Sequence, residues 1–351
     1  MNKPRVARRV QAVGSYGFGN FGDELFVETV HHHGDSLWPD ARLRTFAPTR
    51  PTRVYSTNHL VGKAARLATA TVGLGWADTI AICGGSVLQD IGGVARLRLA
   101  ALRWRRVEAL GVSIGPFPSK EAEGRVGSFL NHLSRLVVRD RASLDRLPDA
   151  LGGADPTVGG DLVALNEWLS PTSPTPGLIT VCPSAAAGSD VSGLVNKINA
   201  AVQRLDGRRP SHRVMMLALS GHDASNDAPI CSAVAAGLTE LGVNAETQSF
   251  AELGVTGTAE LLRTSAMVWS QRLHGAVVAY LTEVPFLLEG HHAKCVDFGS
   301  DIGAEDLVLS SNDSWAEAAE TLSAQSSRPR MEARDYRARA RRIYGIHGWG
   351  R

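Results

Sequence analysis

The sequence "GSYGFGNFGDE", residues 14–24, indicates how the chain begins to fold. It contains the pattern G-x-G-x-x-G in Gly17, Gly19 and Gly22, and it follows the apolar run of residues 10–13. A strand, a glycine-rich turn and a helix in this order predict the first βαβ unit of a parallel sheet. The same order of elements is typical of a dinucleotide-binding site.

Those charges argue against a dinucleotide. Asp23 and Glu24 follow Gly22 where the helix should begin, and two carboxylates there would repel a pyrophosphate from the helix N-terminus. A carboxylate that could hold a ribose should follow the next strand, but the candidate strand 41–47 is followed by proline, threonine and arginine. We therefore expect no nicotinamide or flavin cofactor.

Composition limits the class of protein. The chain has 351 residues, 44% of them hydrophobic, which is enough for two domains of ordinary size. Its net charge of +2 predicts no nucleic-acid partner. The four cysteines form no C-x-x-C pair, and no set of residues has the spacing of metal ligands, so we expect free thiols and no metal. Without a secretory signal or an apolar run of membrane-spanning length, a cytoplasmic enzyme is expected.

Short apolar segments alternate with longer amphipathic ones along the whole chain. This pattern predicts an α/β protein with two Rossmann-like, doubly wound domains facing a cleft. The clearest candidate strands are residues 79–85, 109–116 and 135–140 in the first half, and 177–183, 213–220, 244–250, 265–271 and 284–290 in the second.

Proline, serine and threonine gather in residues 166–177, which indicates a linker. We place the N-terminal domain at 1–168, the linker at 169–177, the second domain at 178–328 and a basic helical tail at 329–351. The tail carries arginines at positions 334, 337, 339, 341 and 342. Because no broad apolar face accompanies this charge, a solvated or domain-bridging helix is favoured over a peripheral membrane contact.

Six motifs follow one another at the predicted strand ends: "GSYGFGNFGDE" (14–24), "GGSVLQD" (84–90), "GVSIGP" (111–116), "RDRASLDRL" (139–147), "GGDLVAL" (159–165) and "SQRLHGAVVAYLTEVPFLLEGHHAKCVDF" (270–298). Their order and spacing resemble the polysaccharide pyruvyl transferase family over nearly the whole chain. The resemblance implies a fold similar to that of GT-B glycosyltransferases. It also implies loop glycines that let the backbone approach a ligand or the facing domain: Gly17, Gly19, Gly22, Gly84 and Gly85.

The resemblance implies transfer of the pyruvyl group of phosphoenolpyruvate onto two hydroxyls of a saccharide, with a cyclic ketal and phosphate as products. The acceptor would be a polysaccharide, a glycolipid or a lipid-linked sugar of the cell envelope or an exopolysaccharide, bound on the N-terminal side, with the donor on the C-terminal side. The reaction would take place in the cytoplasm or at the inner face of the membrane. Two alternatives stay open: a nucleotide-sugar-dependent glycosyltransferase and a non-catalytic saccharide-binding module.

The donor carries up to three negative charges, so its site needs cations, and the reaction needs a group that moves protons near neutral pH. The resemblance assigns donor binding to Arg139 and Lys294 and proton transfer to His274. Arg272, in the same "RLHG" motif as His274, completes the cationic set.

Weaker candidates line the other motifs. Five residues are candidates for acceptor or cleft contacts: Asn20, Asp23, Glu24, Gln89 and Asp90. For the first three, a structural role at the start of the helix is an equal alternative. His291 and His292 stand before Lys294, where the family has a tyrosine-containing sequence, and their role is left open.

Overall fold

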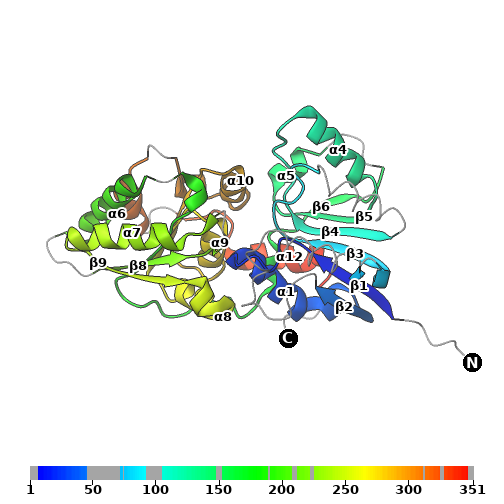
Figure 1. Ribbon diagram of the computed structural model, residues 1–351, viewed down its shortest axis with the longest axis horizontal. Coiled ribbons are helices and arrows are strands. Elements are labelled where there is room, and N and C mark those ends of the chain that lie inside the picture. Colours follow the sequence, from blue (N-terminus) through cyan, green and yellow to red (C-terminus); the bar gives the residue numbers. More distant parts are fainter. Residues whose placement is uncertain are drawn as a thin grey trace, which may run out of the picture. The chain divides into compact units, whose positions relative to one another are not determined.

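The computed structural model describes residues 7–45, 72–73, 75–91, 105–147, 152–188, 190–207, 212–221, 225–310, 313–324 and 328–346. The chain divides into two compact units (Figure 1). Unit 1 comprises residues 1–17, 23–166 and 336–351, and unit 2 comprises residues 18–22 and 167–335. The short segment 18–22 thus belongs to unit 2, and the end of the chain belongs to unit 1. The sequence had led us to place residues 18–22 in the first domain and residues 329–351 in a separate helical tail.

Unit 1 is built on a parallel six-stranded sheet in the order β2-β1-β3-β4-β5-β6. Its strands are β1 (Arg8–Val13), β2 (Ala41–Thr45), β3 (Thr79–Cys83), β4 (Arg106–Val112), β5 (Leu133–Val138) and β6 (Pro156–Val158). Its helices are α4 (Lys120–Leu130), α5 (Arg141–Asp145) and most of α1 (Phe21–Leu37) and of α12 (Ala333–Tyr344), with the 3₁₀ turn η1 (Leu162–Leu165). After its first residue β4 is buried throughout, as expected for a central parallel strand covered on both faces.

Unit 2 holds a second parallel six-stranded sheet, in the order β12-β11-β10-β7-β8-β9. The strands are β7 (Leu178–Cys182), β8 (Arg213–Ala218), β9 (Asn244–Ser249), β10 (Met267–Ser270), β11 (Phe286–Glu289) and β12 (Val308–Leu309). The helices are α6 (Val191–Asp206), α7 (Ala228–Glu240), α8 (Phe250–Arg263), α9 (Leu273–Leu281), α10 (Ala293–Ile302) and α11 (Trp315–Ser323), with the 3₁₀ turns η2 (Ala185–Ala187) and η4 (Glu305–Leu307). The chain direction across the sheet reverses between β7 and β10, which is where doubly wound sheets bind ligands.

The two sheets confirm the predicted fold class. Every strand expected from the sequence is present, and the structure adds the two short edge strands β6 and β12. No helix among the described residues is both long and apolar enough to cross a bilayer.

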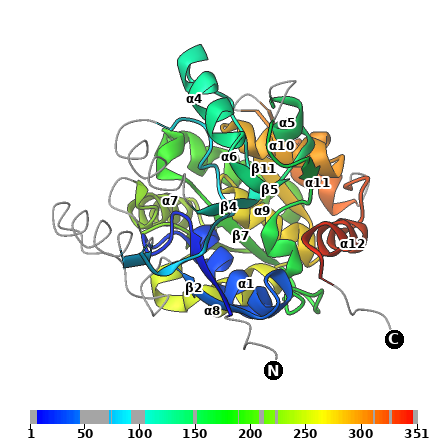
Figure 2. The ribbon, with the colours of Figure 1, turned by 90° about the vertical axis from the view of Figure 1, so that its right-hand side faces the viewer.

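Helix α12, red in Figure 2, is anchored on unit 1 by its two tyrosines. The Tyr336 hydroxyl accepts a hydrogen bond from the backbone N–H of Asp161 at 2.6 Å, and the Tyr344 hydroxyl donates to the Gly160 carbonyl at 2.7 Å. Arg337 donates to the carbonyl of Asn166 at 2.7 Å. From Tyr336 onward, α12 is therefore packed on unit 1, and Arg337 contacts its backbone.

Candidate functional site

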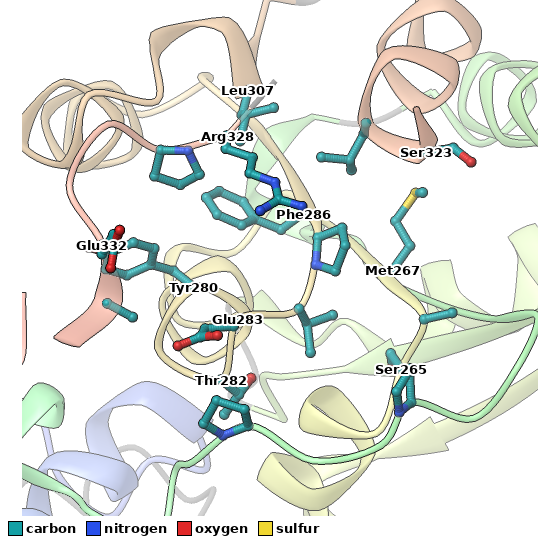
Figure 3. A pocket seen from close by; sticks show the side chains of 18 of the residues that line it. Ser265, Met267, Tyr280, Thr282, Glu283, Phe286, Leu307, Ser323, Arg328 and Glu332 are labelled. Atoms are coloured by element: carbon teal, nitrogen blue, oxygen red, sulfur yellow. The ribbon is translucent and has the colours of Figure 1, made fainter. Parts of the chain in front are cut away.

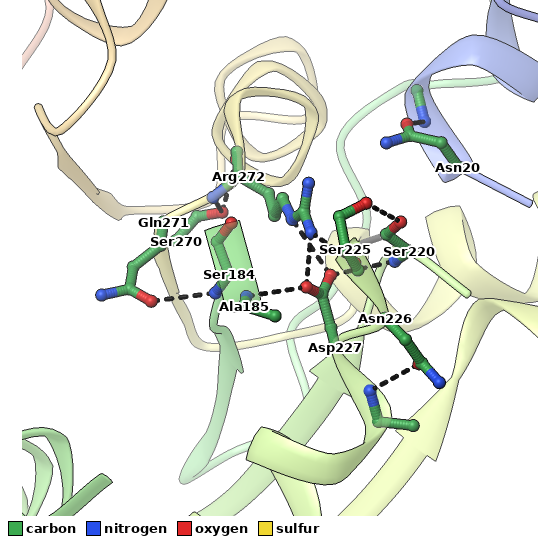
Figure 4. A network of polar contacts seen from close by, with 12 residues as sticks. Asn20, Ser184, Ala185, Ser220, Ser225, Asn226, Asp227, Ser270, Gln271 and Arg272 are labelled. Carbon is green, nitrogen blue, oxygen red and sulfur yellow. Dashed lines mark hydrogen bonds and ion pairs between the residues drawn. The ribbon is translucent and has the colours of Figure 1, made fainter. Parts of the chain in front are cut away.

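The candidate site lies at the carboxyl edge of the unit 2 sheet, around Arg272 (Figure 4). This residue is the N-cap of α9 and follows β10 directly after Gln271. Its Nε donates to Asp227 Oδ2 at 3.0 Å, and its Nη2 donates to Asp227 Oδ1 and, at 3.0 Å, to the Ser225 carbonyl. These bonds, as far as the described residues go, use Nε and Nη2 and leave the N–H groups of Nη1 for another acceptor.

Asp227 fixes this guanidinium in place. Its carboxylate is completely buried and also accepts hydrogen bonds from the backbone N–H groups of Ala185 and Ser220, both at 3.0 Å. One carboxylate thus ties together the loops that follow β7, β8 and β10. Asp227 was not predicted from the sequence, because its only local signal is that of an aspartate at the start of a helix, before Pro229.

Gln271 makes a second link across the strand ends. Its side-chain oxygen accepts from the Ser184 N–H at 2.9 Å, and its amide nitrogen donates to Glu289 Oε2 at 2.7 Å. All three groups are buried, so the ends of β7, β10 and β11 are held in one fixed arrangement.

His274 lies one residue into α9 and is half-buried. Its ring lies against Gly22, which belongs to the segment of unit 2 that comes from the N-terminal motif. In that motif Gly17 and Gly19 have φ values of 81° and 71°, a conformation that favours glycine. Gly22 does not have a positive φ. Glycine is needed there because a side chain would overlap the His274 ring.

Lys294 lies close to two histidines, His291 and His292, at the start of α10. His292 is the N-cap of α10, Lys294 lies in its first turn, and the rings of His291 and His292 are 4.2 Å apart between centroids. Burial, the neighbouring His291 and the charges of Lys294 and Arg272 together lower the pKa of His292 to about 4. Burial also lowers the pKa of His291, and the same two cations add to the effect. Arg272, Lys294 and both histidines therefore share one electrostatic environment.

Two helix N-termini strengthen the positive potential at this edge. In the described structure, neither the N-cap of α9 nor that of α10 uses its side chain to cap the first N–H groups of its helix. Uncapped N–H groups and the positive end of the helix dipole favour an anion. With Arg272 and Lys294 beside them, the edge can hold a small ligand with several negative charges. The described residues contain no group of three side chains that could hold a metal ion.

Arg139 belongs to unit 1. It follows β5, its side chain is 1% exposed, and its Nε donates to Asp140 Oδ2 at 3.2 Å. The charges of Asp140 and Asp161 stabilise the guanidinium in this buried position. Its predicted contact with the donor stays a prediction, and such a contact would require the guanidinium to become exposed.

The other predicted residues have defined local partners. Asn20 Oδ1 accepts from the Gly22 N–H at 3.0 Å, and the buried Glu24 accepts from the Gly17 N–H at 2.6 Å, so both shape the glycine turn. Asp23 lies in the first turn of α1.

In the loop after β3, Gly84 packs against the ring of Phe26, and Gly85 follows it. Gln89 donates to the Gly115 carbonyl at 3.3 Å, and Asp90 pairs with Arg125 at 2.6 Å. Acceptor contacts by these residues stay predictions.

A cavity of about 920 Å³ lies at the opposite edge of the unit 2 sheet (Figure 3). It is lined by Ile179, Met267 and Phe286, which stand at the starts of β7, β10 and β11. Because the strands are parallel, these residues lie at the amino ends of the strands whose carboxyl ends carry Gln271 and Arg272. The cavity is therefore separate from the candidate site.

Comparison with solved structures supports the fold. The UDP-GlcNAc 2-epimerase of Methanocaldococcus jannaschii, solved in complex with UDP-GlcNAc and UDP, matches with a TM-score of 0.58 at 10% identity, covering 95% of this chain and 99% of that one. A putative UDP-N-acetylglucosamine 2-epimerase from Listeria monocytogenes matches with a TM-score of 0.53 at 13% identity, covering 96% and 92%. These likenesses concern the fold alone.

Sequence comparison gives the family. No curated protein matches the chain. The family model described as polysaccharide pyruvyl transferase matches residues 20–292, which include Gly22, Arg139, Arg272, His274 and the histidine pair. This match spans well over half of the chain, and the protein therefore belongs to the polysaccharide pyruvyl transferase family.

Proposed function

We propose that this protein transfers the pyruvyl group of phosphoenolpyruvate onto two hydroxyls of a saccharide. Two C–O bonds form at the enol carbon, the bond from that carbon to the phosphate oxygen breaks, and the products are a cyclic ketal and inorganic phosphate. Of the two hydroxyl protons, one ends on the former methylene carbon, which becomes a methyl group, and the other leaves with the phosphate. The reaction is balanced without an oxidant or reductant.

The observation that carries the proposal is the fixed guanidinium of Arg272 at the switch point of the unit 2 sheet. Asp227 holds it from one side, so the N–H groups of Nη1 are oriented before a ligand arrives. A preorganised pair of donors suits a carboxylate or phosphate oxygen. Because Asp227 balances the charge of Arg272, we propose that Lys294 and the N-termini of α9 and α10 supply the net attraction for the donor.

His274 is the group that we propose for proton transfer. It lies in the first turn of α9, two residues after Arg272, so the chain places it beside the proposed donor position. Imidazole has an ordinary pKa near neutrality and can give a proton to the methylene carbon or take one from an attacking hydroxyl.

The remaining parts of the proposal concern partners and conditions. The acceptor that we propose is a saccharide diol of a polysaccharide, a glycolipid or a lipid-linked sugar, bound with the help of unit 1 residues such as Gln89 and Asp90. We propose that the reaction uses no cofactor and no metal. It would take place in the cytoplasm, or at the inner face of the membrane where the acceptor is lipid-linked.

Phosphate release tests this function. The protein is mixed with phosphoenolpyruvate and a panel of oligosaccharides that carry free 4,6- or 3,4-diols, with and without a chelator. We expect phosphate release that depends on a saccharide, that continues in the chelator, and that yields a product heavier by the pyruvyl group in mass spectrometry. Transfer from a nucleotide sugar instead, or saccharide binding without turnover of either donor, would contradict the proposal.

A further inference from the structure

The segment Phe18–Gly22 lies near the start of the sequence but belongs to unit 2. The N–H of Phe21 donates to the Leu219 carbonyl, and the N–H of Gly221 donates to the Gly19 carbonyl, both at 2.9 Å. The Phe21 ring packs against the ring of Phe250, with 5.9 Å between centroids. Backbone pairing and an aromatic contact thus fix this segment beside the loop that follows β8.

Gly22 ends this segment and lies directly against His274. A Cβ atom added to Gly22 would lie 1.9 Å from Nδ1, 2.4 Å from Cγ and 2.6 Å from Cε1 of the imidazole. All three separations are far below the distance between carbon atoms in contact, which is about 3.5–4.0 Å. Any side chain at position 22 would therefore overlap the ring, so His274 can keep this position only beside glycine.

Neither backbone can move aside easily. The Gly22 N–H is bound to Asn20 Oδ1 at 3.0 Å, which holds the end of the segment. On the other side, Asp227 holds Arg272 at the start of α9, and a Cβ on Gly275 would lie 2.5 Å from Ser270 Oγ, so the first turn of α9 is closely packed. The imidazole is the movable part, and an added methyl group at position 22 would rotate it away.

We propose that Gly22 is a positioning residue for the imidazole of His274, an inference that rests on the proton-transfer role proposed above. The third glycine of the G-x-G-x-x-G pattern would then serve a histidine 252 residues later in the chain. It would not serve the approach of a pyrophosphate. A displacement of about 1 Å at a reacting group can cost on the order of 10²-fold in rate.

Gly22→Ala tests the inference in steady-state kinetics. We expect kcat to fall by about 10- to 100-fold, with the KM for phosphoenolpyruvate changed by less than about threefold, because the displaced group is the one that moves the proton. Gly124→Ala is the matched control. Gly124 lies in α4, where an added Cβ meets no atom within 4 Å, so this variant should keep its kcat and become slightly more stable.

A double-mutant cycle separates positioning from a general structural effect. In a His274→Ala background the whole imidazole is absent, so Gly22→Ala should cause no further loss of kcat. The decrease in melting temperature that the clash causes should also be smaller there, and this holds even if the single variant folds poorly. An unchanged kcat in Gly22→Ala, or equal losses in both backgrounds, would overturn the inference. Full turnover by His274→Asn alone would instead remove the proton-transfer role on which it rests.

Discussion

Each unit carries an arginine that follows a strand and pairs with an aspartate, but the two pairs differ in exposure. In unit 1 the side chains of Arg139 and Asp140 are both 1% exposed. In unit 2 Asp227 is fully buried while Arg272 is 15% exposed. An arginine–aspartate pair beyond the carboxyl end of a parallel strand can therefore be fully buried or remain partly exposed.

The two arginines differ in exposure because different residues surround them. In unit 1 the backbone N–H of the neighbouring Asp161 donates to the Tyr336 hydroxyl of α12, and the Tyr344 hydroxyl of the same helix donates to the Gly160 carbonyl. In unit 2 the neighbours of Arg272 are the uncapped N-termini of α9 and α10, with Lys294 in the first turn of α10. Both tyrosines of α12 thus form hydrogen bonds with the backbone of unit 1, whereas the strand ends of unit 2 carry two cations and two helix N-termini without a side-chain cap.

The largest effect is expected from His274→Asn at the edge of unit 2. Asparagine keeps some hydrogen bonding but cannot move a proton, so kcat should fall by roughly 10²- to 10⁴-fold while the fold and most of the donor affinity remain. Steady-state kinetics with varied phosphoenolpyruvate measure both constants. A raised donor KM with kcat intact would mean that His274 only orients the donor.

Arg139→Ala should act mainly on stability. Removing the guanidinium leaves Asp140 buried without its partner, which should lower the free energy of unfolding by about 3–5 kcal/mol. Urea unfolding measures the loss. Arg139→Lys keeps the positive charge, so its free energy of unfolding should fall less. This variant therefore separates a structural role of Arg139 from a role in donor binding. If this variant is folded but its donor KM rises by 100-fold or more, Arg139 contacts the donor and the contrast between the two units fails.

Asp227→Asn should have a smaller effect on stability than Arg139→Ala, because the partially exposed Arg272 can turn toward water. We expect a loss of about 1.5–3 kcal/mol in the free energy of unfolding and a donor KM raised by about tenfold, since the guanidinium is no longer fixed. Calorimetric binding of phosphoenolpyruvate to the variant tests this. Unchanged donor affinity would show that the Asp227–Arg272 pair is structural, like the pair in unit 1.

The smallest effect is expected from His292→Gln, as a change in pH dependence. The pKa of His292 is about 4 in the folded protein against an ordinary value of 6.5, so between these values the unfolded chain binds a proton that the folded chain does not. His292 therefore makes stability fall as the pH drops from 6.5 to 4. The glutamine variant should lose stability less steeply in urea unfolding across this window.

Bound phosphoenolpyruvate sharpens the same measurement. Its negative charges should offset those of Lys294 and Arg272 and bring the pKa of His292 back toward its ordinary value. The difference in slope between the two proteins should then shrink when the donor is present. Equal slopes without the donor would mean that the pKa of His292 is not lowered in the folded protein.

Most of the fold could be predicted from the sequence. Segments such as 79–85 and 265–271 became β3 and β10 because an apolar run bounded by turn residues is a local signal. The strands β6 and β12 were missed because they have three and two residues, too few for any periodicity. The grouping of residues 18–22 with unit 2 and of residues 336–351 with unit 1 depends on contacts between segments far apart in the sequence, which no local pattern predicts.

The two α/β sheets, the family motifs and the position of His274 just after a strand could be recognised in the sequence, because each depends on residues that are neighbours in the chain. Three features are visible only in the folded protein. Asp227 binds Arg272 across 45 residues, Gly22 lies against the His274 ring, and Arg139 is buried while Arg272 is partly exposed. The physical reason is that topology brings distant strand ends together. Burial then depends on what packs over each end, and both properties belong to the folded chain as a whole.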